Sequence, residues 1–468
     1  MNFASFPFLL FLSVCTLIYF SLKKSGRHWF LLFASYFFYA LFGFGFALLM
    51  LITSAITYTT SYYCSRSEDP RRRRFLLWLG LGLDLSIFVL FKYIHIIDMD
   101  IMNWPDWSAQ KLLIPVGISF YTFKTIGYCV DIYRRKYAAE PSFAYYALSV
   151  SFFPQLIAGP IEKSVVIAAQ LKKGEGPNKE NIMEGAKLIV WGLFKKVVIA
   201  DSIAQTINVC YTRVEQYSGL DFLVISVAFI YQIYADFSGY SDIAIGAAKF
   251  FNVHLPSNFN KPFFAKNYRD FWTRWHTTFS RWLKEYVFDE LGGVVRHNRF
   301  KTVRNLFIVF LVVGFWHGAT PNYMIYAMLA FVWMLLDIVT KDQRKDLFAA
   351  LKIKKGTLLM RSINYMGMII MFTSLAFFFR PVTTQDSMII LSQLSFTGLH
   401  RFNLDSSVYI LLMIIVLEVL QSFQLTPDGS CFQGIKKTWI RMALYIIILF
   451  LLIGSSARPD VSFQYFQF

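Results

Sequence analysis

Long apolar segments recur along the chain, and short groups of lysine and arginine separate them. Hydrophobic residues make up 56% of the 468 residues and charged residues only 16%, well below the roughly 25% of soluble domains. Basic loops between membrane-length apolar segments are typical of the cytoplasmic side of a bilayer. The net charge of +17 therefore indicates membrane topology and argues against nucleic-acid binding. The sequence predicts an all-α, polytopic membrane protein.

The alternation of apolar and basic segments predicts about twelve transmembrane helices, within a range of about eleven to thirteen, and places both termini outside the cytoplasm. Residues 66–74 form a basic loop predicted to be cytoplasmic, and a loop with Asp98, Asp100 and Asp106 is predicted to lie outside. Two prolines and a glycine interrupt the apolar residues 143–160. A re-entrant or interfacial element fits this segment better than a span.

Several simple classes of site are not indicated by the sequence. The five cysteines are scattered without a CxxC pair, so neither a disulfide framework nor a zinc site is expected. The apolar run at residues 5–22 has no cleavage pattern, and we interpret it as a retained first span. The chain has no P-loop, no HExxH and no glycine-rich dinucleotide turn. We expect one integral membrane domain over residues 1–468 without a metal site.

The longest polar section covers residues 236–304, which we expect at the cytoplasmic face or the membrane interface. From Trp272 to Val287, aromatic and apolar residues recur at steps of three and four, which predicts one amphipathic helix lying at the interface. This spacing places His276 on the aromatic face. A core histidine bonded to a backbone carbonyl fits the same spacing, so the pattern alone leaves His276 open.

Residues 305–340 predict a helical hairpin that turns at Pro321. His317 ends its first helix, in a run that is short for a bilayer span, and a titratable group there is a candidate functional residue. Gly314 and Gly318 allow a helix or a ligand to approach closely. An interfacial anchor made of Trp316 and His317 is equally compatible with this pattern.

The segment Asp236–Asp242 is a polar cluster directly after an apolar run. Its aspartates and serines predict that it ends a span, caps the helix and turns the chain. A direct chemical role for Asp236, Ser238 or Tyr240 is the alternative. The sequence favours capping and turn formation over a direct chemical role.

The chain also carries six short motifs in a fixed order. They are Ile114–Phe123, Phe152–Ile161, Asp236–Gly246, Asp270–His276, Trp316–Gly318 and Tyr465–Phe468. In their order and spacing they closely resemble the membrane-bound O-acyltransferase (MBOAT) family, and within it the bacterial alginate O-acetylase and peptidoglycan O-acetyltransferase branch. One departure is Asp289-Glu290-Leu291, where relatives often have Ile-Pro-Leu.

The resemblance implies a fold and a set of site residues. Such proteins form a ring of helices, with re-entrant and interfacial helices, around a central tunnel. By position, the invariant histidine of the family corresponds to His317 and its second catalytic position to His276. Candidate tunnel positions are Trp316, Trp275, Asp236, Ser238 and Tyr240. Candidate contacts to the phosphates of an acyl donor are Arg269, Arg274 and Lys284.

The resemblance also implies an activity. We expect an acetyl group to pass from cytoplasmic acetyl-CoA, with no permanently bound cofactor, to a hydroxyl of an extracytoplasmic polysaccharide such as an alginate-like polymer or peptidoglycan. We also expect a periplasmic SGNH-type partner and a location in the bacterial inner membrane. Neutral imidazole can serve as base or as nucleophile. The alternatives are D-alanyl transfer to teichoic acid from a carrier protein, and a polysaccharide exporter without chemistry, which would be expected to show inverted repeats.

Overall fold

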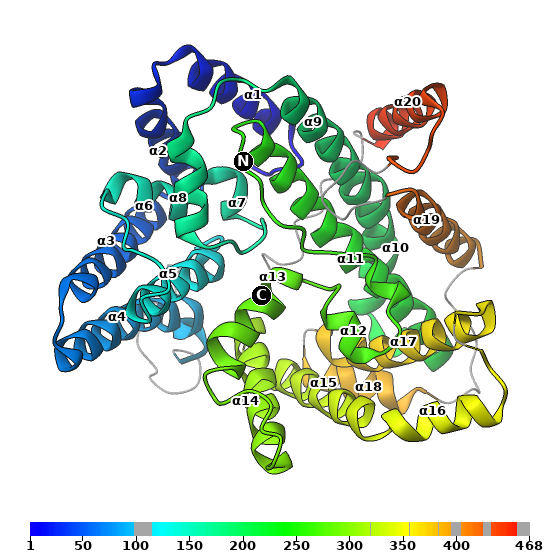
Figure 1. The fold of residues 1–468 in the computed structure, drawn as a ribbon. Coiled ribbons are helices and arrows are strands. Elements are labelled where there is room, and N and C mark those ends of the chain that lie inside the picture. Colours follow the sequence, from blue (N-terminus) through cyan, green and yellow to red (C-terminus); the bar gives the residue numbers. More distant parts are fainter. Residues whose placement is uncertain are drawn as a thin grey trace, which may run out of the picture. The chain divides into compact units, whose positions relative to one another are not determined.

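The computed structural model describes residues 1–97, 115–318, 320–354, 356–381, 383–394, 404–424 and 432–455. Across these ranges the regular structure consists of helices, and no strand occurs (Figure 1). The predicted acidic loop with Asp98, Asp100 and Asp106, and the motif Tyr465–Phe468, lie outside the described residues.

Eight described helices are long and apolar enough to cross a membrane. Their bounds are Phe44–Arg66, Pro70–Tyr93, Gly219–Lys249, Arg299–His317, Pro321–Val339, Leu358–Phe379, Asp405–Ser422 and Thr438–Ser455. The helix Phe6–Ser21 is also apolar but shorter. The prediction of an all-α, polytopic membrane protein is thus confirmed. The total of eleven to thirteen spans and the ring around a tunnel stay predictions.

The chain divides into two compact units, of which the first comprises residues 1–189 and 240–256 and the second residues 190–239 and 257–468. Two of the three boundaries between the units fall within helices, α9 (Lys179–Leu193) and α11 (Gly219–Lys249), and the third follows residue 256. A single domain over residues 1–468 stays a prediction.

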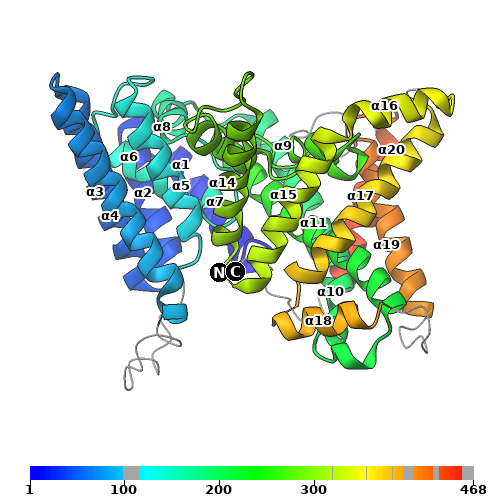
Figure 2. The same ribbon diagram turned by 90° about the horizontal axis from the view of Figure 1, so that it is seen from below.

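The first unit is a helical bundle in which α3, α4 and α5 pack side by side (Figure 2). Its helices are α1 (Phe6–Ser21), α2 (Lys24–Ala40), α3 (Phe44–Arg66), α4 (Pro70–Ile97), α5 (Ile118–Tyr133), α6 (Phe143–Ser151), α7 (Phe153–Leu156) and α8 (Ser164–Lys173). The apolar residues 143–160 contain α6, with nine residues, and α7, with four. Neither is long enough to span a bilayer. The interrupted sequence was therefore a correct sign that this segment is not one transmembrane helix.

The second unit carries the remaining helices. They are a π-helix at Phe194–Ala200, α10 (Asp201–Tyr211), α12 (Tyr268–Trp272), α13 (Thr277–Leu283), a π-helix at Lys284–Phe288, α14 (Arg299–His317), α15 (Pro321–Val339), α16 (Lys341–Ala350), α17 (Leu358–Phe379), α18 (Thr384–Ser392), α19 (Leu404–Ser422) and α20 (Thr438–Ser455), with 3-10 turns at Val214–Gln216 and Pro262–Phe264. In Figure 2, α16 and α18 lie across opposite ends of α15 and α17.

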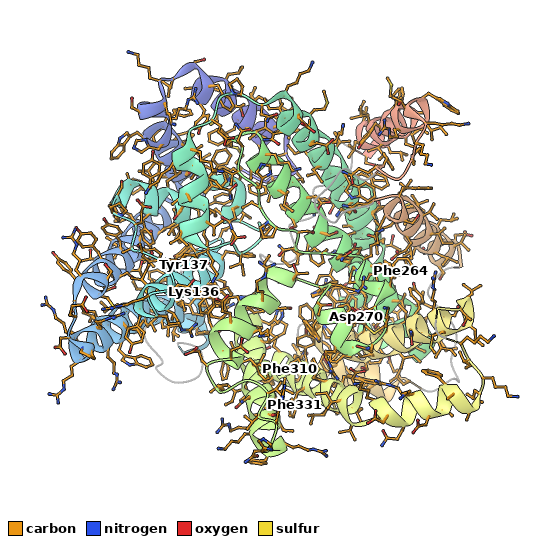
Figure 3. The ribbon with its side chains drawn as sticks, viewed as in Figure 1. Lys136, Tyr137, Phe264, Asp270, Phe310 and Phe331 are labelled. Carbon is orange, nitrogen blue, oxygen red and sulfur yellow. The ribbon has the colours of Figure 1, made fainter. Side chains whose placement is uncertain are left out.

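Helices α14 and α15 form a hairpin with a tightly packed seam. Phe310 of α14 and Phe331 of α15 meet in this seam, with ring centroids 6.2 Å apart (Figure 3). Helix α14 has 19 residues because it begins at Arg299, within the basic segment. The prediction that the run ending at His317 is short for a span was therefore wrong, since basic residues extend the helix at its start.

Two further predictions of local structure were wrong. The segment Asp236–Asp242 does not turn the chain but lies inside α11, whose 31 residues continue to Lys249. The single amphipathic helix from Trp272 to Val287 is broken, because α12 ends at Trp272 and α13 starts only at Thr277. In both segments, tertiary contacts of the polar residues outweigh the local pattern.

Candidate active site

His317 is the last residue of α14 and is 5% exposed. It is held in place by the close approach of α14 to α15, because a Cβ added at Gly314 would lie 2.9 Å from Cβ of Ala327. Gly318 follows with φ +147°, a conformation that side chains rarely adopt, and turns the chain toward α15. Glycines at these two positions therefore set both the depth and the direction of the His317 side chain.

Aromatic rings surround the imidazole of His317. The ring centroid of Trp316 lies 4.4 Å away, that of Phe379 4.9 Å and that of Tyr326 5.5 Å. Tyr323 stacks on the imidazole at 5.9 Å. These rings come from α14, α15 and α17, so three helices build the surroundings of one side chain.

His276 lies between α12 and α13 in the left-handed region, with φ +40°. Hydrogen bonds hold this unusual backbone, because the amide of Thr277 donates to the carbonyl of Asn258 at 2.9 Å and the hydroxyl of Thr278 donates to Oδ1 of Asn258 at 2.6 Å. Non-glycine residues in this region cost free energy and are concentrated at functional sites. No pattern in the sequence indicates this turn.

The imidazole of His276 is 2% exposed and lies among Phe237, Phe279 and Trp316, at centroid distances of 4.8, 5.1 and 6.0 Å. Neither ring nitrogen has a hydrogen-bond partner among the described residues. The structure therefore does not support the alternative of a core histidine bonded to a backbone carbonyl. Burial lowers the pKa of His276 to about 3, so its imidazole is neutral at physiological pH.

One pocket of the second unit is lined by both histidines together with Trp275 and Trp316. The other lining side chains are aromatic or apolar and include Phe229, Trp272, Phe279, Tyr326 and Phe379. Burial in an apolar pocket disfavours the protonated form of an imidazole, so the ring is neutral, and neither water nor a carboxylate competes with a bound reactant for its nitrogens. The arrangement suits a reaction that moves a proton away from water.

The sequence comparisons identify the family of the chain. The family model described as MBOAT, membrane-bound O-acyltransferase family, matches residues 134–379, a range that contains both histidines. The peptidoglycan O-acetyltransferase of Helicobacter pylori is 31% identical over 98% of this chain and 95% of its own length. The chain belongs to the membrane-bound O-acyltransferase family. As a member of this family it is an O-acyltransferase, and the predictions of the family and of an enzyme are confirmed.

Two further relatives show the range of the similarity. The probable alginate O-acetylase AlgI of Pseudomonas putida is 31% identical over the whole of both chains. The teichoic acid D-alanyltransferase of Streptococcus thermophilus is 25% identical over 64% of this chain and 74% of its own length. The O-acetylases therefore match this MBOAT chain over more of its length than the D-alanyltransferase does.

Three predicted tunnel residues of the MBOAT chain do not line this pocket. Asp236 is 1% exposed, and its carboxylate pairs with Nζ of Lys196 at 3.1 Å. Ser238 is buried in the same helix. Tyr240 belongs to the other unit, where its hydroxyl donates to Oδ1 of Asn2. Direct roles for these three residues stay predictions.

The three basic residues predicted to bind the donor also lie outside the pocket lining, and each has an acidic neighbour. Arg274 pairs with Asp270 at 3.1 Å and Lys284 with Asp289 at 2.7 Å. Arg269 lies 4.0 Å from Asp337. Their positive charges are therefore partly compensated within the protein, and donor binding by these residues stays a prediction.

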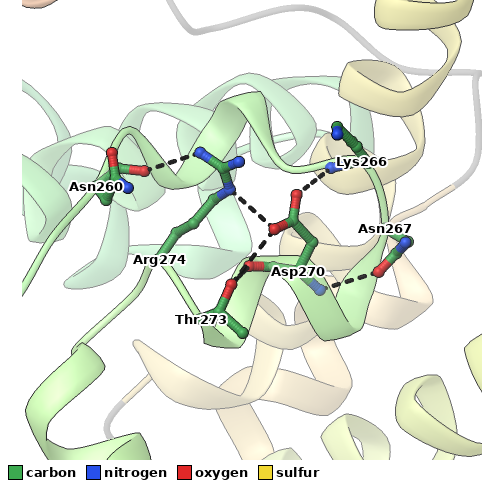
Figure 4. Close-up of polar contacts among 6 residues, drawn as sticks. All are labelled: Asn260, Lys266, Asn267, Asp270, Thr273 and Arg274. Carbon is green, nitrogen blue, oxygen red and sulfur yellow. Dashed lines mark hydrogen bonds and ion pairs between the residues drawn. The ribbon is translucent and has the colours of Figure 1, made fainter. Parts of the chain in front are cut away.

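Asp270 organises the turn that leads to His276 (Figure 4). Its carboxylate accepts hydrogen bonds from the amide of Lys266 at 2.9 Å and from Nε of Arg274 at 3.1 Å. Burial opposes ionisation of this carboxyl, but the hydrogen bonds from Lys266 and Arg274 outweigh burial and lower its pKa. Asn267 caps α12 by accepting from the amide of Asp270. The hydrogen bonds of Asp270 thus fix the turn that precedes His276.

Sequence reasoning missed the part of the site that comes from α15 and α17. Tyr326 and Phe379 contact His317 from positions that look like ordinary apolar helix. One signal was available, because Arg380 follows an apolar run directly. A charge at the end of a membrane-length segment marks a candidate functional residue by the same reasoning that selected His317.

Proposed function

We propose that this O-acyltransferase transfers an acetyl group from acetyl-CoA, taken at the cytoplasmic face, to a hydroxyl of an extracytoplasmic polysaccharide such as peptidoglycan or an alginate-like polymer. The observation that carries the proposal is the apolar pocket shared by the buried histidines His276 and His317. The names of the full-length relatives, peptidoglycan O-acetyltransferase and probable alginate O-acetylase, support an acetyl donor and a glycan acceptor.

His317 acts as the general base in this proposal. The acceptor hydroxyl gives its proton to the imidazole as its oxygen attacks the thioester carbonyl. The carbon–sulfur bond then breaks, and the proton held by His317 passes to the leaving thiolate. No further reactant is needed, because one ester and one thiol are formed from one thioester and one hydroxyl.

His276 stabilises charge on the thioester oxygen. Its imidazole is neutral, so one of its two ring nitrogens carries a hydrogen. Because neither nitrogen has a partner among the described residues, that hydrogen is available to the oxygen that becomes negative during attack. The rings of Phe279 and Trp316 keep water from competing for it.

The distribution of charge supports an orientation in the bacterial inner membrane. Helices α14 and α17 begin next to basic residues, among them Arg299 and Arg361, and end at His317 and Phe379. The positive-inside rule places their starts in the cytoplasm and the His317 end toward the outside. A periplasmic SGNH-type partner that receives the acetyl group and passes it to the glycan fits this orientation, as do extracytoplasmic termini.

The second candidate is D-alanyl transfer to teichoic acid, and the similarity to the teichoic acid D-alanyltransferases of Streptococcus thermophilus and Bacillus subtilis favours it. These relatives are 25% and 27% identical, over 64% and 48% of this chain. The acetylases cover more of the chain at higher identity, so we prefer acetyl transfer. An exporter without chemistry has no support from any relative named above.

Thiol release from acetyl-CoA by the purified protein in nanodiscs, with a polysaccharide present to supply the attacking hydroxyl, tests the proposal. We expect release that stops in His317→Ala and continues in His297→Ala, a matched control because His297 is exposed. Release from a D-alanyl carrier protein but not from acetyl-CoA would favour the second candidate. A stable acetyl-histidine at His317, detected by mass spectrometry after acid quench, would show that His317 is a nucleophile and not a base.

A further inference from the structure

Tyr326 carries the only hydroxyl among the described side chains that line the pocket shared by the two histidines. It belongs to α15 and lies beside the proposed base, because its ring is perpendicular to the imidazole of His317 at a centroid distance of 5.5 Å. The ring also packs against Phe379 of α17, with centroids 4.9 Å apart. Contacts with two further helices thus fix the position of this hydroxyl relative to His317.

The hydroxyl of Tyr326 is not engaged within the part of the chain that the structure describes. The side chain is 9% exposed, and its hydroxyl makes no hydrogen bond with a described residue. A buried tyrosine hydroxyl usually has a partner, because a donor without an acceptor costs free energy in apolar surroundings. Tyr365 shows the usual arrangement, since its hydroxyl bonds that of Tyr231 at 2.6 Å. A ligand in the pocket would supply the acceptor that Tyr326 lacks.

We infer that Tyr326 is a further catalytic residue, whose hydroxyl donates a hydrogen bond to the carbonyl oxygen of the acyl donor. The inference rests on the proposed function and adds a second donor to that of His276. Negative charge collects on the carbonyl oxygen during attack, and a fixed donor in an apolar pocket stabilises this charge more than it stabilises the neutral thioester. The phenol proton stays on its own oxygen, so the bonds made and broken in the transfer are unchanged.

The position of Tyr326 favours the carbonyl oxygen over the other polar atoms of the reactants. The acceptor hydroxyl gives its proton to His317 while it attacks, so the carbonyl group lies close to the imidazole in the reacting complex. Tyr326 lies beside this space on α15. The described side chains that line the pocket include no lysine or arginine to neutralise the developing charge. Neutral donors must therefore stabilise it, and acyl-transfer sites commonly use two.

A purely structural role for Tyr326 makes a different prediction. Its ring contacts with His317 and Phe379 remain when phenylalanine takes its place, so Tyr326→Phe removes the hydroxyl alone. Tyr365→Phe is the matched control, because it removes a bonded hydroxyl from the same unit, and Tyr365 does not line the pocket. If the hydroxyl of Tyr326 served only packing, the two variants would behave alike.

The first test measures thiol release from acetyl-CoA by the full chain in nanodiscs with a polysaccharide present. We expect Tyr326→Phe to lower kcat by at least about tenfold, because one donor to the oxyanion is lost. The KM for acetyl-CoA should change by no more than about threefold, since the bond is much weaker before the charge develops. Tyr365→Phe should change neither constant to this extent.

The second test is infrared spectroscopy of bound S-acetonyl-CoA that carries carbon-13 in its ketone group. This analogue has a methylene group between the sulfur and the carbonyl carbon, so it cannot transfer an acyl group and requires no polysaccharide. A hydrogen bond lowers the stretching frequency of a carbonyl group. We expect the labelled band at a lower frequency in the unmodified protein and in Tyr365→Phe than in Tyr326→Phe.

Three outcomes overturn the inference. They are an unchanged kcat in Tyr326→Phe, an equal loss of kcat in Tyr326→Phe and Tyr365→Phe, and a carbonyl band at the same frequency in Tyr326→Phe and the unmodified protein. The last outcome together with a lower kcat would assign the hydroxyl to His317 or to the acceptor. Failure of S-acetonyl-CoA to bind the unmodified protein would instead overturn acetyl-CoA as the donor in the proposed function, and the inference with it.

Discussion

The indole of Trp316 lies against the imidazole of His317, with ring centroids 4.4 Å apart. The same indole lies 6.0 Å from the imidazole of His276, and it packs against the ring of Phe279 at a centroid distance of 4.3 Å. Trp316 thus contacts both histidines although about forty residues separate them in the sequence. Trp316 therefore forms one side of the pocket that the two histidines share.

His317→Ala should lower acyl transfer by about two to four orders of magnitude, because it removes the proton acceptor. The variant should remain folded, since the imidazole packs against rings that also pack against each other, such as Tyr326 and Phe379 at 4.9 Å. Thiol release and size-exclusion behaviour in nanodiscs measure the two effects. Full activity in His317→Ala, with His297→Ala as the control, would exclude His317 from the chemistry.

His276 should make the protein less stable in acid. Burial lowers its pKa to about 3, so between about pH 6.5 and about pH 3 the unfolded chain binds a proton that the folded chain does not. The free energy of unfolding therefore decreases as pH falls below about 6.5, by on the order of 1 to 2 kcal/mol at pH 5. Melting temperatures at pH 7.5 and pH 5 should differ less in His276→Gln than in the unmodified protein. An equal difference in both proteins would contradict the prediction.

Gly314 should be required because α14 and α15 approach closely at this position. An added Cβ would lie 2.9 Å from Cβ of Ala327 and 3.2 Å from the carbonyl oxygen of Tyr323. Gly314→Ala should cost about 1 to 3 kcal/mol of stability and lower activity by moving His317. Adding Ala327→Gly should restore part of both losses. Gly367→Ala is the control, because nothing lies within 4 Å of the added Cβ, and equal effects of the two glycine substitutions would refute this explanation.

Asp270 and Arg274 should act as one pair that positions the turn before His276. Asp270→Asn and Arg274→Ala should lower kcat to similar extents, and the double variant should be no worse than either single variant. The KM for acetyl-CoA should change by no more than about twofold, since both side chains are partly exposed and the pair is screened by solvent. A large increase in KM in Arg274→Ala alone would instead support the prediction that Arg274 binds the donor.

Lys196 should be important for folding because it neutralises two buried carboxylates. Its Nζ lies 2.6 Å from Asp201 and 3.1 Å from Asp236, and it is 1% exposed. Lys196→Met should destabilise the protein by about 3 to 5 kcal/mol, because the carboxylates would lose their buried counter-charge. Lys187→Met is the control, since Lys187 pairs with Glu184 in a more exposed position. Melting temperatures that agree between the two variants would contradict this assignment.

The sequence was most informative where a titratable residue lies in an apolar segment, because that placement costs free energy. His317 stood out because an imidazole ends an apolar run, and the structure places it among four aromatic rings. The helical periodicity around His276 predicted a continuous helix and was wrong there. Hydrogen bonds to Asn258 hold His276 at a φ of +40°, and the spacing of apolar residues does not indicate such bonds. The prediction that the chain turns at Asp236 was wrong for a similar reason. Asp236 does not end the helix, because its buried carboxylate is balanced by Lys196 and α11 continues to Lys249.

The class of the protein could be predicted from composition alone, since the free energy of transfer into a bilayer depends on the composition of each segment and not on its partners. Its ordered motifs also indicated the family and selected His276 and His317. The folded structure was needed to show that these histidines share one pocket with Trp316 and Phe379, and that Arg380 lies beside it. Such contacts join helices distant in sequence, and their free energy comes from packing between side chains that local patterns do not specify.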